Sequence, residues 1–385
     1  MKKTTCIASL MVCLSMGQAG ALAQNIRIDM NKTYPEKTIS LQKVADVKYI
    51  PLETTDEALF NGVVTHLSAE GIAGFNKKEG DILVFDGTGK AIASFNHTGQ
   101  GPNEYNKIYH LDVDWKQKEV YVQDNFRQKI RIYALNGSHL RTIDLQETMQ
   151  QGDLYNFSDT HLIYYAQPKS KPVTPYEPVT LLSKKDASKA TLPFTKTDDN
   201  LVKATGGPFG DMKMSAKNVN LLCKKGDEVY VNEVTADVIY RVESNHALTP
   251  VVERTPSYQD ASGQDFFLML TGANARYYFF KRQQALLEFQ GNAATDTKST
   301  YVAYDRKEKQ LLNPTFTNED YPSQDISMSK LLQCAGSANR CYLQLEAFKL
   351  KEALVEGKLK GTLKSIAEKL DEEDNPVLMV VEFKK

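Results

Sequence analysis

The chain has 385 residues, of which 41% are hydrophobic and 25% charged. Its 47 basic and 48 acidic residues give a formal net charge of −1 at pH 7, which argues against a nucleic-acid groove, since such a groove needs a strong basic excess. The hydrophobic content is sufficient for a core and argues against disorder.

The first 23 residues resemble an export signal. The basic start MKK precedes the apolar stretch CIASLMVCLSMG, which is too short to span a bilayer, and Ala21-Leu22-Ala23 has the small-x-small pattern of a cleavage site. Cleavage after Ala23 would leave a single domain over residues 24–385. We therefore expect an exported protein, periplasmic or secreted.

Lipid anchoring is the alternative fate of this N-terminus. Cys13 would become the lipidated residue, but Val12 stands where lipoprotein processing needs a small residue. Simple export is the favoured reading. Beyond the signal, no apolar run is long enough to cross a membrane, so the mature chain is predicted to have no transmembrane segment.

Short alternating strands make up the first half of the mature chain. Residues 81–95, DILVFDGTGKAIASF, are predicted as a hairpin around a Gly-Thr-Gly turn. Residues 108–145 are predicted as four antiparallel strands, because Leu111, Val113 and Trp115 alternate with polar residues and Asn136-Gly137 favours a tight turn. This unit is one blade of a β-propeller or one meander of a barrel.

The same pattern recurs further along the chain. Strands are predicted in THLIYYAQ, VTLLSKK, VNLLCKKGDEVYVNEVTADVIYRVES, YYFFKRQQALLEFQG, STYVAYDRKEKQLLNP, CYLQLEAF and PVLMVVEF. In YYFF, Tyr277 and Phe279 are expected in the core, and Tyr278 and Phe280 on the opposite sheet face. About six sheet units at intervals of roughly 50–60 residues indicate a closed ring, which leaves few exposed strand edges.

One segment near the C-terminus is helical in composition. In residues 349–376, Leu359, Leu363, Ile366 and Leu370 follow one another at three- and four-residue spacing and form one apolar stripe. We expect a helical insertion packed on the flank of the strands. A helix that binds a partner is the alternative.

The stretch HTGQGPNEY, residues 97–105, superficially resembles a phosphate-binding loop. Only Gly99 and Gly101 fit the dinucleotide pattern, because Glu104 stands at the third glycine position and Pro102 has no N–H to offer an anion. An alternating strand follows, so no helix terminus faces the loop. The stretch is predicted as a corner of a sheet.

This corner and the strands after it resemble an NHL-type propeller repeat. The matching positions are Gly99, Gly101, Val122, Asp124, Ile130, Tyr133 and Gly137. With the G-x-G-P-x-E-Y variant at 99–105, VKYIPLETT before it and DEEDNPVLMVVEFKK at the end, the chain resembles the exported six-bladed β-propeller proteins of Bacteroidota from about Ile39 onward. The resemblance implies an all-β six-bladed propeller and carries no agreed catalytic residues.

A ligand site is predicted at the mouth of the central channel. Tyr105, His110, Phe126 and Arg127 flank strands of the best-defined blade, and aromatic rings beside a guanidinium suit a sugar ring or a peptide carboxylate. The alternative is packing between blades for Tyr105 and Phe126, and a solvated salt bridge for Arg127.

Two aspartates of the same blade are the candidate ligands for a metal ion. Asp112 and Asp114 share one strand face and could offer carboxylates to Ca²⁺, although such residues more often face solvent or bind backbone groups. Asp124 is expected to accept hydrogen bonds from the turn that follows it. The six histidines show no metal-binding spacing, and apart from Ca²⁺ no cofactor is expected.

Three cysteines follow the signal: Cys223, Cys334 and Cys341. The segment CAGSANRC could close a disulfide between Cys334 and Cys341, worth about 2–3 kcal/mol in the chain-entropy model. Two buried free thiols are the alternative.

Together these features favour an exported, non-catalytic recognition scaffold. We expect a monomer that binds a glycan, a peptide or a cell-envelope protein, and no nucleic acid. The alternative is a propeller enzyme, a lyase or hydrolase with a metal-assisted site at the channel mouth, which would need histidines or carboxylates that converge there.

Overall fold

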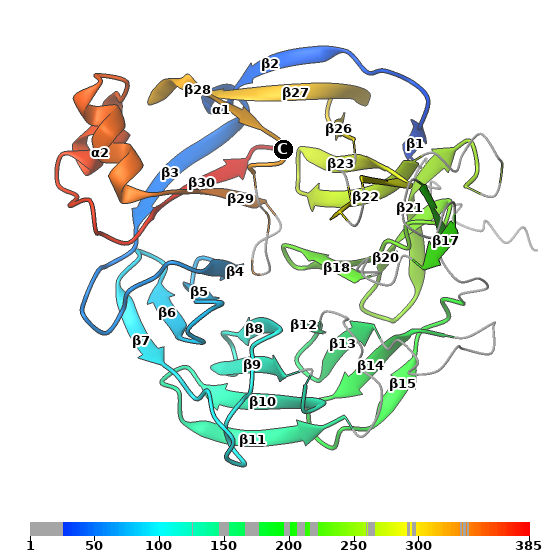
Figure 1. Ribbon diagram of the computed structural model, residues 1–385, viewed down its shortest axis with the longest axis horizontal. Coiled ribbons are helices and arrows are strands. Elements are labelled where there is room, and N and C mark those ends of the chain that lie inside the picture. Colours follow the sequence, from blue (N-terminus) through cyan, green and yellow to red (C-terminus); the bar gives the residue numbers. More distant parts are fainter. Residues whose placement is uncertain are drawn as a thin grey trace, which may run out of the picture.

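The computed structural model describes residues 26–385 except 125, 146–153, 166–176, 196–200, 206–211, 216–221, 259, 261–265, 291–292, 295–297, 332, 334–335 and 337–338. Six sheets stand around a central axis, and their innermost strands surround the channel (Figure 1). The predicted six-bladed β-propeller is confirmed. The predicted signal and Cys13 lie outside the described residues.

Blades 1 to 3 are four-stranded antiparallel meanders that run from the channel outward in chain order. Blade 1 contains β4 (Val63–Leu67), β5 (Gly71–Phe75), β6 (Ile82–Asp86) and β7 (Ala91–Phe95). Blade 2 contains β8 (His110–Asp114), β9 (Glu119–Asp124), β10 (Lys129–Ala134) and β11 (His139–Asp144). Blade 3 contains β12 (Leu154–Asn156), β13 (His161–Tyr165), β14 (Val179–Ser183) and β15 (Lys189–Thr191).

Blades 4 and 5 each gain a strand from the N-terminus. Blade 4 contains β18 (Leu222–Lys225), β19 (Glu228–Val231), β20 (Val238–Val242) and β21 (Leu248–Thr255), with β1 (Ile26–Asp29) parallel to β21. Blade 5 contains β22 (Phe266–Ala273), β23 (Tyr277–Gln284), β26 (Ser299–Asp305) and β27 (Gln310–Asn318). Two further strands pair with β27: β2 (Glu36–Ser40), which is parallel to it, and β28 (Tyr321–Ser327).

Blade 6 closes the ring by joining the two ends of the chain. It contains β29 (Arg340–Leu345), β30 (Val377–Phe383) and, after the short helix α1 (Leu41–Val44), β3 (Ala45–Pro51). The seven residues of β3 pair with β30 in antiparallel register from Ala45↔Phe383 to Pro51↔Val377. We call residues 26–51 the N-terminal strap, because they line three successive blades.

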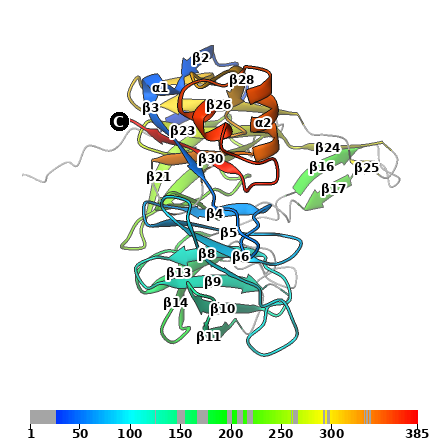
Figure 2. The ribbon, with the colours of Figure 1, turned by 90° about the vertical axis from the view of Figure 1, so that its left-hand side faces the viewer.

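A separate sheet lies beside the ring rather than within it (Figure 2). It contains β16 (Leu201–Thr205), β17 (Met212–Ser215), β24 (Leu286–Gln290) and β25 (Ala293–Ala294), and β16 runs parallel to β24. The sequence grouped residues 277–291 into one unit. The structure corrects this, because β23 stays in blade 5 while β24 leaves it to pair with β16.

The helical insertion lies between β29 and β30, as predicted, but it is two helices rather than one. They are α2 (Ala347–Val355) and α3 (Gly361–Ala367). Gly357, at φ 68°, separates them, and its N–H donates to the Leu354 carbonyl at 3.0 Å, which is the usual way for glycine to end a helix. The predicted stripe is buried against blades 5 and 6 through Leu359 and Leu363, among others, so the insertion packs on the flank of the ring.

Hydrophobic side chains fill the spaces between blades. Tyr277 and Phe279 pack in the cluster that includes the helices, whereas Tyr278 and Phe280 pack in the cluster that includes strap residues Ile26 and Ile28. The predicted alternation of this strand is therefore correct, and both of its faces are buried because blades pack on both sides of it.

The direction of the strands gives the ring two different faces. In an antiparallel meander, the turns between the first and second and between the third and fourth strands share one end of the blade. The turn between the second and third strands and the connection to the next blade share the other. We call the face with the connections between blades the connector face, and the other the hairpin face.

Candidate functional site

The corner at residues 99–105 is held by Arg127, which follows β9 on the connector face. Its guanidinium donates to the carbonyl oxygens of Gly99 and Gly101, both at 3.1 Å, and to Gln100 Oε1 at 2.7 Å. The Gly101 N–H donates to Glu104 Oε2 at 2.7 Å. The corner binds its own side chains, so the rejection of a phosphate loop agrees with the structure.

The burial of Tyr105 disagrees with the ligand-binding role predicted for it, whereas a ligand role of the half-buried Arg127 stays a prediction. The described hydrogen bonds of Arg127 are to the corner and not to a carboxylate. Tyr105 is fully buried, and its hydroxyl donates to the Gly80 carbonyl at 2.7 Å and accepts from the His97 N–H at 3.0 Å. Its burial raises its pKa to about 12. Tyr105 acts as a core residue, which was the alternative interpretation.

Phe126 and His110 are accessible, as a ligand site requires. Phe126 is 73% exposed at the turn between β9 and β10, and Tyr109, just before β8, is 40% exposed. His110 is half-buried, and its ring meets the Tyr155 ring edge-on with centroids 5.0 Å apart. We call Phe126, Tyr109 and His110 the aromatic patch. Sequence reasoning missed Tyr109, although alternation placed it next to the first strand of the blade.

Asp112 is the centre of a buried polar cluster in the channel. Its carboxylate accepts hydrogen bonds from His66 Nδ1 at 3.2 Å, Lys224 Nζ at 3.2 Å and the Asn156 N–H at 2.7 Å. Lys224 Nζ also donates to the Asn156 carbonyl at 2.7 Å. These residues come from β4, β8, β12 and β18, the innermost strands of four successive blades, so the cluster ties blades 1 to 4 together.

The connection between blades 5 and 6 reaches the same cluster. Gly336 has φ 106°, and a Cβ built on it would lie 2.4 Å from His66 Nε2. Its N–H donates to the Gly226 carbonyl at 3.3 Å. Only glycine fits this conformation and this contact. His66 is thereby covered on one side by backbone from across the ring.

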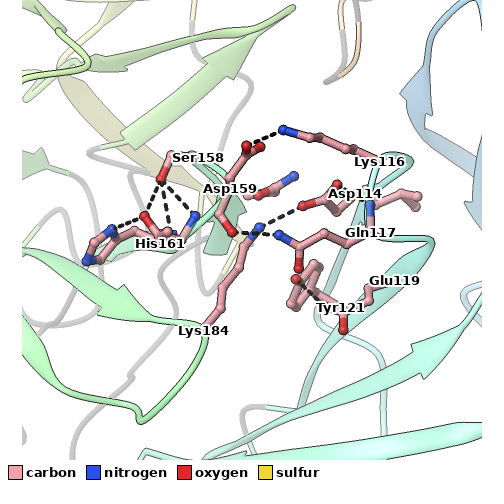
Figure 3. A network of polar contacts seen from close by, with 12 residues as sticks. Asp114, Lys116, Gln117, Glu119, Tyr121, Ser158, Asp159, His161 and Lys184 are labelled. Carbon is pink, nitrogen blue, oxygen red and sulfur yellow. Dashed lines mark hydrogen bonds and ion pairs between the residues drawn. The ribbon is translucent and has the colours of Figure 1, made fainter.

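Asp114 anchors a second network, between blades 2 and 3 on the hairpin face (Figure 3). Lys184 Nζ donates to Asp114 Oδ2 at 2.7 Å and lies 5.3 Å from the centre of the Tyr121 ring. The Tyr121 hydroxyl donates to Glu119 Oε2 at 2.5 Å, and Arg141 binds Glu119 through both of its terminal nitrogens. A buried lysine is thus paired with a carboxylate and also makes a cation–π contact with an aromatic face.

The turns of the two blades are tied together above this network. Lys116, in the turn between β8 and β9, pairs with Asp159 in the turn between β12 and β13. Gln117 Nε2 donates to the Asp159 carbonyl at 2.6 Å. Figure 3 shows Ser158 next to Asp159 in the same turn, with His161 on the side of Ser158 that is away from Lys116. These contacts join neighbouring blades.

The two aspartates proposed for Ca²⁺ already face cationic partners. Lys224 and Lys184 supply the positive charge next to Asp112 and Asp114, and each lysine is at least nine-tenths buried. Among the described residues, no group of three or more His, Cys, Asp or Glu side chains is arranged to hold a metal ion. A Ca²⁺ site here stays a prediction, and it would have to displace a lysine.

Both carboxylates are held in their charged form. Burial alone would raise the pKa of Asp112, but the Lys224 charge and the His66 hydrogen bond outweigh it and lower the pKa below its usual value. For Asp114, burial also acts to raise the pKa, and the hydrogen bonds from Lys184 and from the Gln117 N–H more than compensate. The folded state therefore favours ionised aspartates at these two positions.

A pH dependence of stability follows. Because both pKa values are lowered on folding, the stabilisation is present at neutral pH, above the unfolded value of about 3.9. It is lost as the pH falls from about 5 toward the folded values. We expect the urea midpoint of the wild type to drop over this range, and that of Asp112→Asn to drop less. Equal drops in both proteins would mean that Asp112 does not contribute.

The remaining predictions on Asp124 and the cysteines have different outcomes. Asp124 is fully buried and accepts from the Asn106 N–H at 2.8 Å, the Arg127 N–H at 3.2 Å and Arg131 Nη1 at 3.0 Å, so its predicted role in the turn is confirmed. Cys341 is a buried free thiol, and its burial raises its pKa to about 12. Because Cys341 is free, it agrees with the alternative of unpaired thiols and not with the predicted disulfide, and Cys334 itself lies outside the described residues.

The buried lysines were not foreseen from the sequence. Lys184 and Lys224 stand in the similar stretches LLSKK and LLCKK, where the first lysine comes two residues after a buried leucine, Leu182 or Leu222. A lysine at that position of an alternating strand is a usable signal for an internal cation. Its partner could not be named, because Asp112 and Lys224 belong to different blades.

These features define an all-β six-bladed propeller with buried ion pairs in its channel and with two exposed aromatic residues, Phe126 and Tyr109, on its connector face. The chain belongs to the family described as a domain of unknown function, DUF4934, whose model matches residues 25–382. No curated protein matches the chain. In the part of the chain that the structure describes, no helix has the length and apolar character to cross a membrane.

Several solved structures are similar. A Bacteroides fragilis protein described as a candidate exported protein has a TM-score of 0.64 at 14% identity, with 94% of this chain and 99% of that chain covered. This likeness supports the predicted resemblance to Bacteroidota propellers at the level of fold. A DUF4221 member from Bacteroides vulgatus has a TM-score of 0.49 at 8% identity, covering 89% and 98% of the two chains.

A virginiamycin B lyase from Staphylococcus aureus is a more distant neighbour. Its TM-score is 0.40 at 9% identity, and the match covers 88% of this chain and 99% of that one. The lyase activity belongs to that protein, and nothing about this chain follows from it.

Proposed function

We propose that the protein is an exported, non-catalytic recognition scaffold that binds a glycan, a peptide or another cell-envelope protein through the aromatic patch. The observation that carries this proposal is Phe126, a large aromatic side chain that is 73% exposed on the connector face. Exposed aromatic residues on a rigid support are typical anchors of binding surfaces.

Hydrogen bonds anchor residues on both sides of Phe126. Asp124, two residues earlier, is fully buried and bonded to Arg131, and Arg127, the next residue, is bonded to the Gly99–Gly101 corner. Side chains on a pre-formed turn lose little entropy on binding, which favours affinity. Tyr109 and His110 lie at the start of β8, beside the end of β9, because these two strands pair.

The competing enzyme hypothesis needs reactive groups that converge on the channel. In the described chain, His66 and Lys224 do converge on Asp112, but both bind its carboxylate, and the backbone at Gly336 covers the His66 ring. No observation favours a metal-assisted lyase or hydrolase over recognition.

The test is a titration of the mature chain, residues 24–385, against panels of glycans and of peptides, read by thermal shift and calorimetry. For a ligand found this way, Phe126→Ala should weaken binding more than about tenfold, the effect expected of a hot-spot residue. The free energy of unfolding should change by less than about 0.5 kcal/mol, because Phe126 is exposed.

The matched control is Leu140→Ala, another exposed apolar residue, 49% accessible, on the outer strand of the same blade. It should leave binding unchanged. Equal losses in both variants, or no loss in Phe126→Ala, would rule out the aromatic patch as the binding surface.

A further inference from the structure

Two histidines from neighbouring blades lie side by side on the hairpin face. His161 opens β13 in blade 3, and His246 lies in the turn between β20 and β21 in blade 4. Their ring centroids are 5.8 Å apart and their planes are inclined by 78°. The sequence showed no metal-binding spacing, because the two residues belong to different blades and meet only when the ring is formed.

His161 is oriented by its own turn. Its Nδ1 lies 2.9 Å from the Thr160 hydroxyl, and its backbone N–H donates to Ser158 Oγ at 3.1 Å. Among the described residues, Nε2 of His161 makes no hydrogen bond, so that nitrogen is available. A hydrogen bond to one ring nitrogen that fixes the direction of the other is the usual outer-shell arrangement of a metal-binding histidine.

His246 is presented from the other side. It is exposed, has φ 68°, and its N–H donates to the Glu243 carbonyl at 2.8 Å. Phe157 packs against its ring with centroids 6.0 Å apart. The tight turn fixes the backbone, while the imidazole keeps the rotational freedom of an exposed side chain.

The separation of the two rings suits one shared metal ion. With a metal–nitrogen distance of about 2.0–2.1 Å and tetrahedral angles, two ligating imidazoles have centroids about 5 Å apart. A small rotation of the exposed His246 ring would shorten the observed centroid separation of 5.8 Å to this value. Imidazole nitrogen is the ligand preferred by Zn²⁺, Ni²⁺ and Cu²⁺ rather than by Ca²⁺.

We propose that His161 and His246 form a binding site for a divalent transition-metal ion such as Zn²⁺, which would bridge blades 3 and 4. No third His, Cys, Asp or Glu ligand is arranged around them in the described chain, so water completes the coordination. The site lies on the hairpin face, away from the aromatic patch, and it does not depend on the proposed function.

The experiment is calorimetric titration of the mature chain, first stripped with EDTA, with ZnCl₂ alone. We expect one bound ion per chain and a rise in Tm on adding Zn²⁺, because the ion binds the folded state. His161→Ala and His246→Ala should each abolish measurable binding at the same concentrations. Thr160→Val, which keeps both histidines, should weaken binding about tenfold, as loss of an outer-shell partner does.

The matched control is His110→Ala, a half-buried histidine on the connector face, which should bind Zn²⁺ like the wild type. A cooperative melting transition of each variant in EDTA, at a Tm near that of the wild type, shows that the variant is folded. The proposal is overturned if the wild type binds no Zn²⁺, if either variant of the pair binds as the wild type does, or if His110→Ala also loses binding.

Discussion

Replacing Asp112 with alanine should lower the free energy of unfolding by about 3–5 kcal/mol, because it leaves a buried cation without a counter-charge. Lys224 is 9% exposed, and its ammonium group is bonded to the Asp112 carboxylate at 3.2 Å and to the Asn156 carbonyl. Without the carboxylate, the Asn156 carbonyl is the hydrogen-bond partner of Lys224 that remains among the described residues. A loss of this size is a large part of the stability of a typical domain.

The loss of stability should exceed that from breaking an ordinary ion pair, because the Asp112 carboxylate also accepts hydrogen bonds from backbone N–H groups. The Asn156 N–H and the Val113 N–H both donate to this carboxylate, at 2.7 and 2.8 Å. Buried N–H groups left without acceptors cost about 1–3 kcal/mol each unless water reaches them. The measurement is urea denaturation at pH 7, with the midpoint and the m-value read separately.

Two comparisons make the result specific. Asp46→Ala removes a surface pair with Lys384, whose side chains are 62% and 52% exposed, and should cost less than about 1 kcal/mol. The double variant Asp112→Leu with Lys224→Met should recover the part of the loss that comes from the unpaired lysine charge, since a buried ion pair can be replaced by apolar groups at little cost, but not the part that comes from the Asn156 and Val113 N–H groups. If Asp112→Ala costs no more than Asp46→Ala, the cluster does not hold the blades together.

The parts of the fold that follow from local chemistry could be predicted from the sequence. Blade 2 was predicted strand by strand because its residues alternate strictly and Asn136-Gly137 supplies a turn with φ 85° at the glycine. The helical insertion was visible in its apolar stripe. Both signals are local, because each depends only on the spacing of residues within one short segment of the chain.

The parts that depend on ring closure could not be predicted. The pairing of β1 with β21 joins Ile26 to Val252, and no local pattern reports a partner so far along the chain. The same holds for Lys224 with Asp112, and for His161 with His246. Tyr105 and Phe126 illustrate the limit for the site, since both are aromatic residues near turns, yet one is fully buried and the other is 73% exposed.

A chain that begins at Leu52, without the strap, should fail to unfold cooperatively. This deletion removes β3, and with it the antiparallel register that joins the N-terminal half to β30. It also removes the buried side chains of Ile28, Ile39 and Leu41. Each is worth about 1.5–3 kcal/mol by burial, so the total approaches the whole stability of a typical domain of about 5–15 kcal/mol.

Two single substitutions in β1 test the contribution of individual strap side chains. Ile28→Ala, at a fully buried position of β1, should cost about 2–5 kcal/mol and leave a folded ring. Arg27→Ala, the neighbouring residue with a 73% exposed side chain paired to Glu253, should cost less than about 1 kcal/mol. Circular dichroism and urea denaturation report both the fold and its stability.

The strap matters more than its length suggests because of where its strands pair. In blades 4 and 5 it adds an outermost strand, so its loss bares edges, whereas in blade 6 it supplies one of the three strands that the described residues form. A ring closed by strand pairing loses its closure when that strand is removed, and the exposed edge of β30 then becomes a site for aggregation. A strapless chain that melts at the wild-type temperature with an unchanged m-value would show that the ring closes without β3.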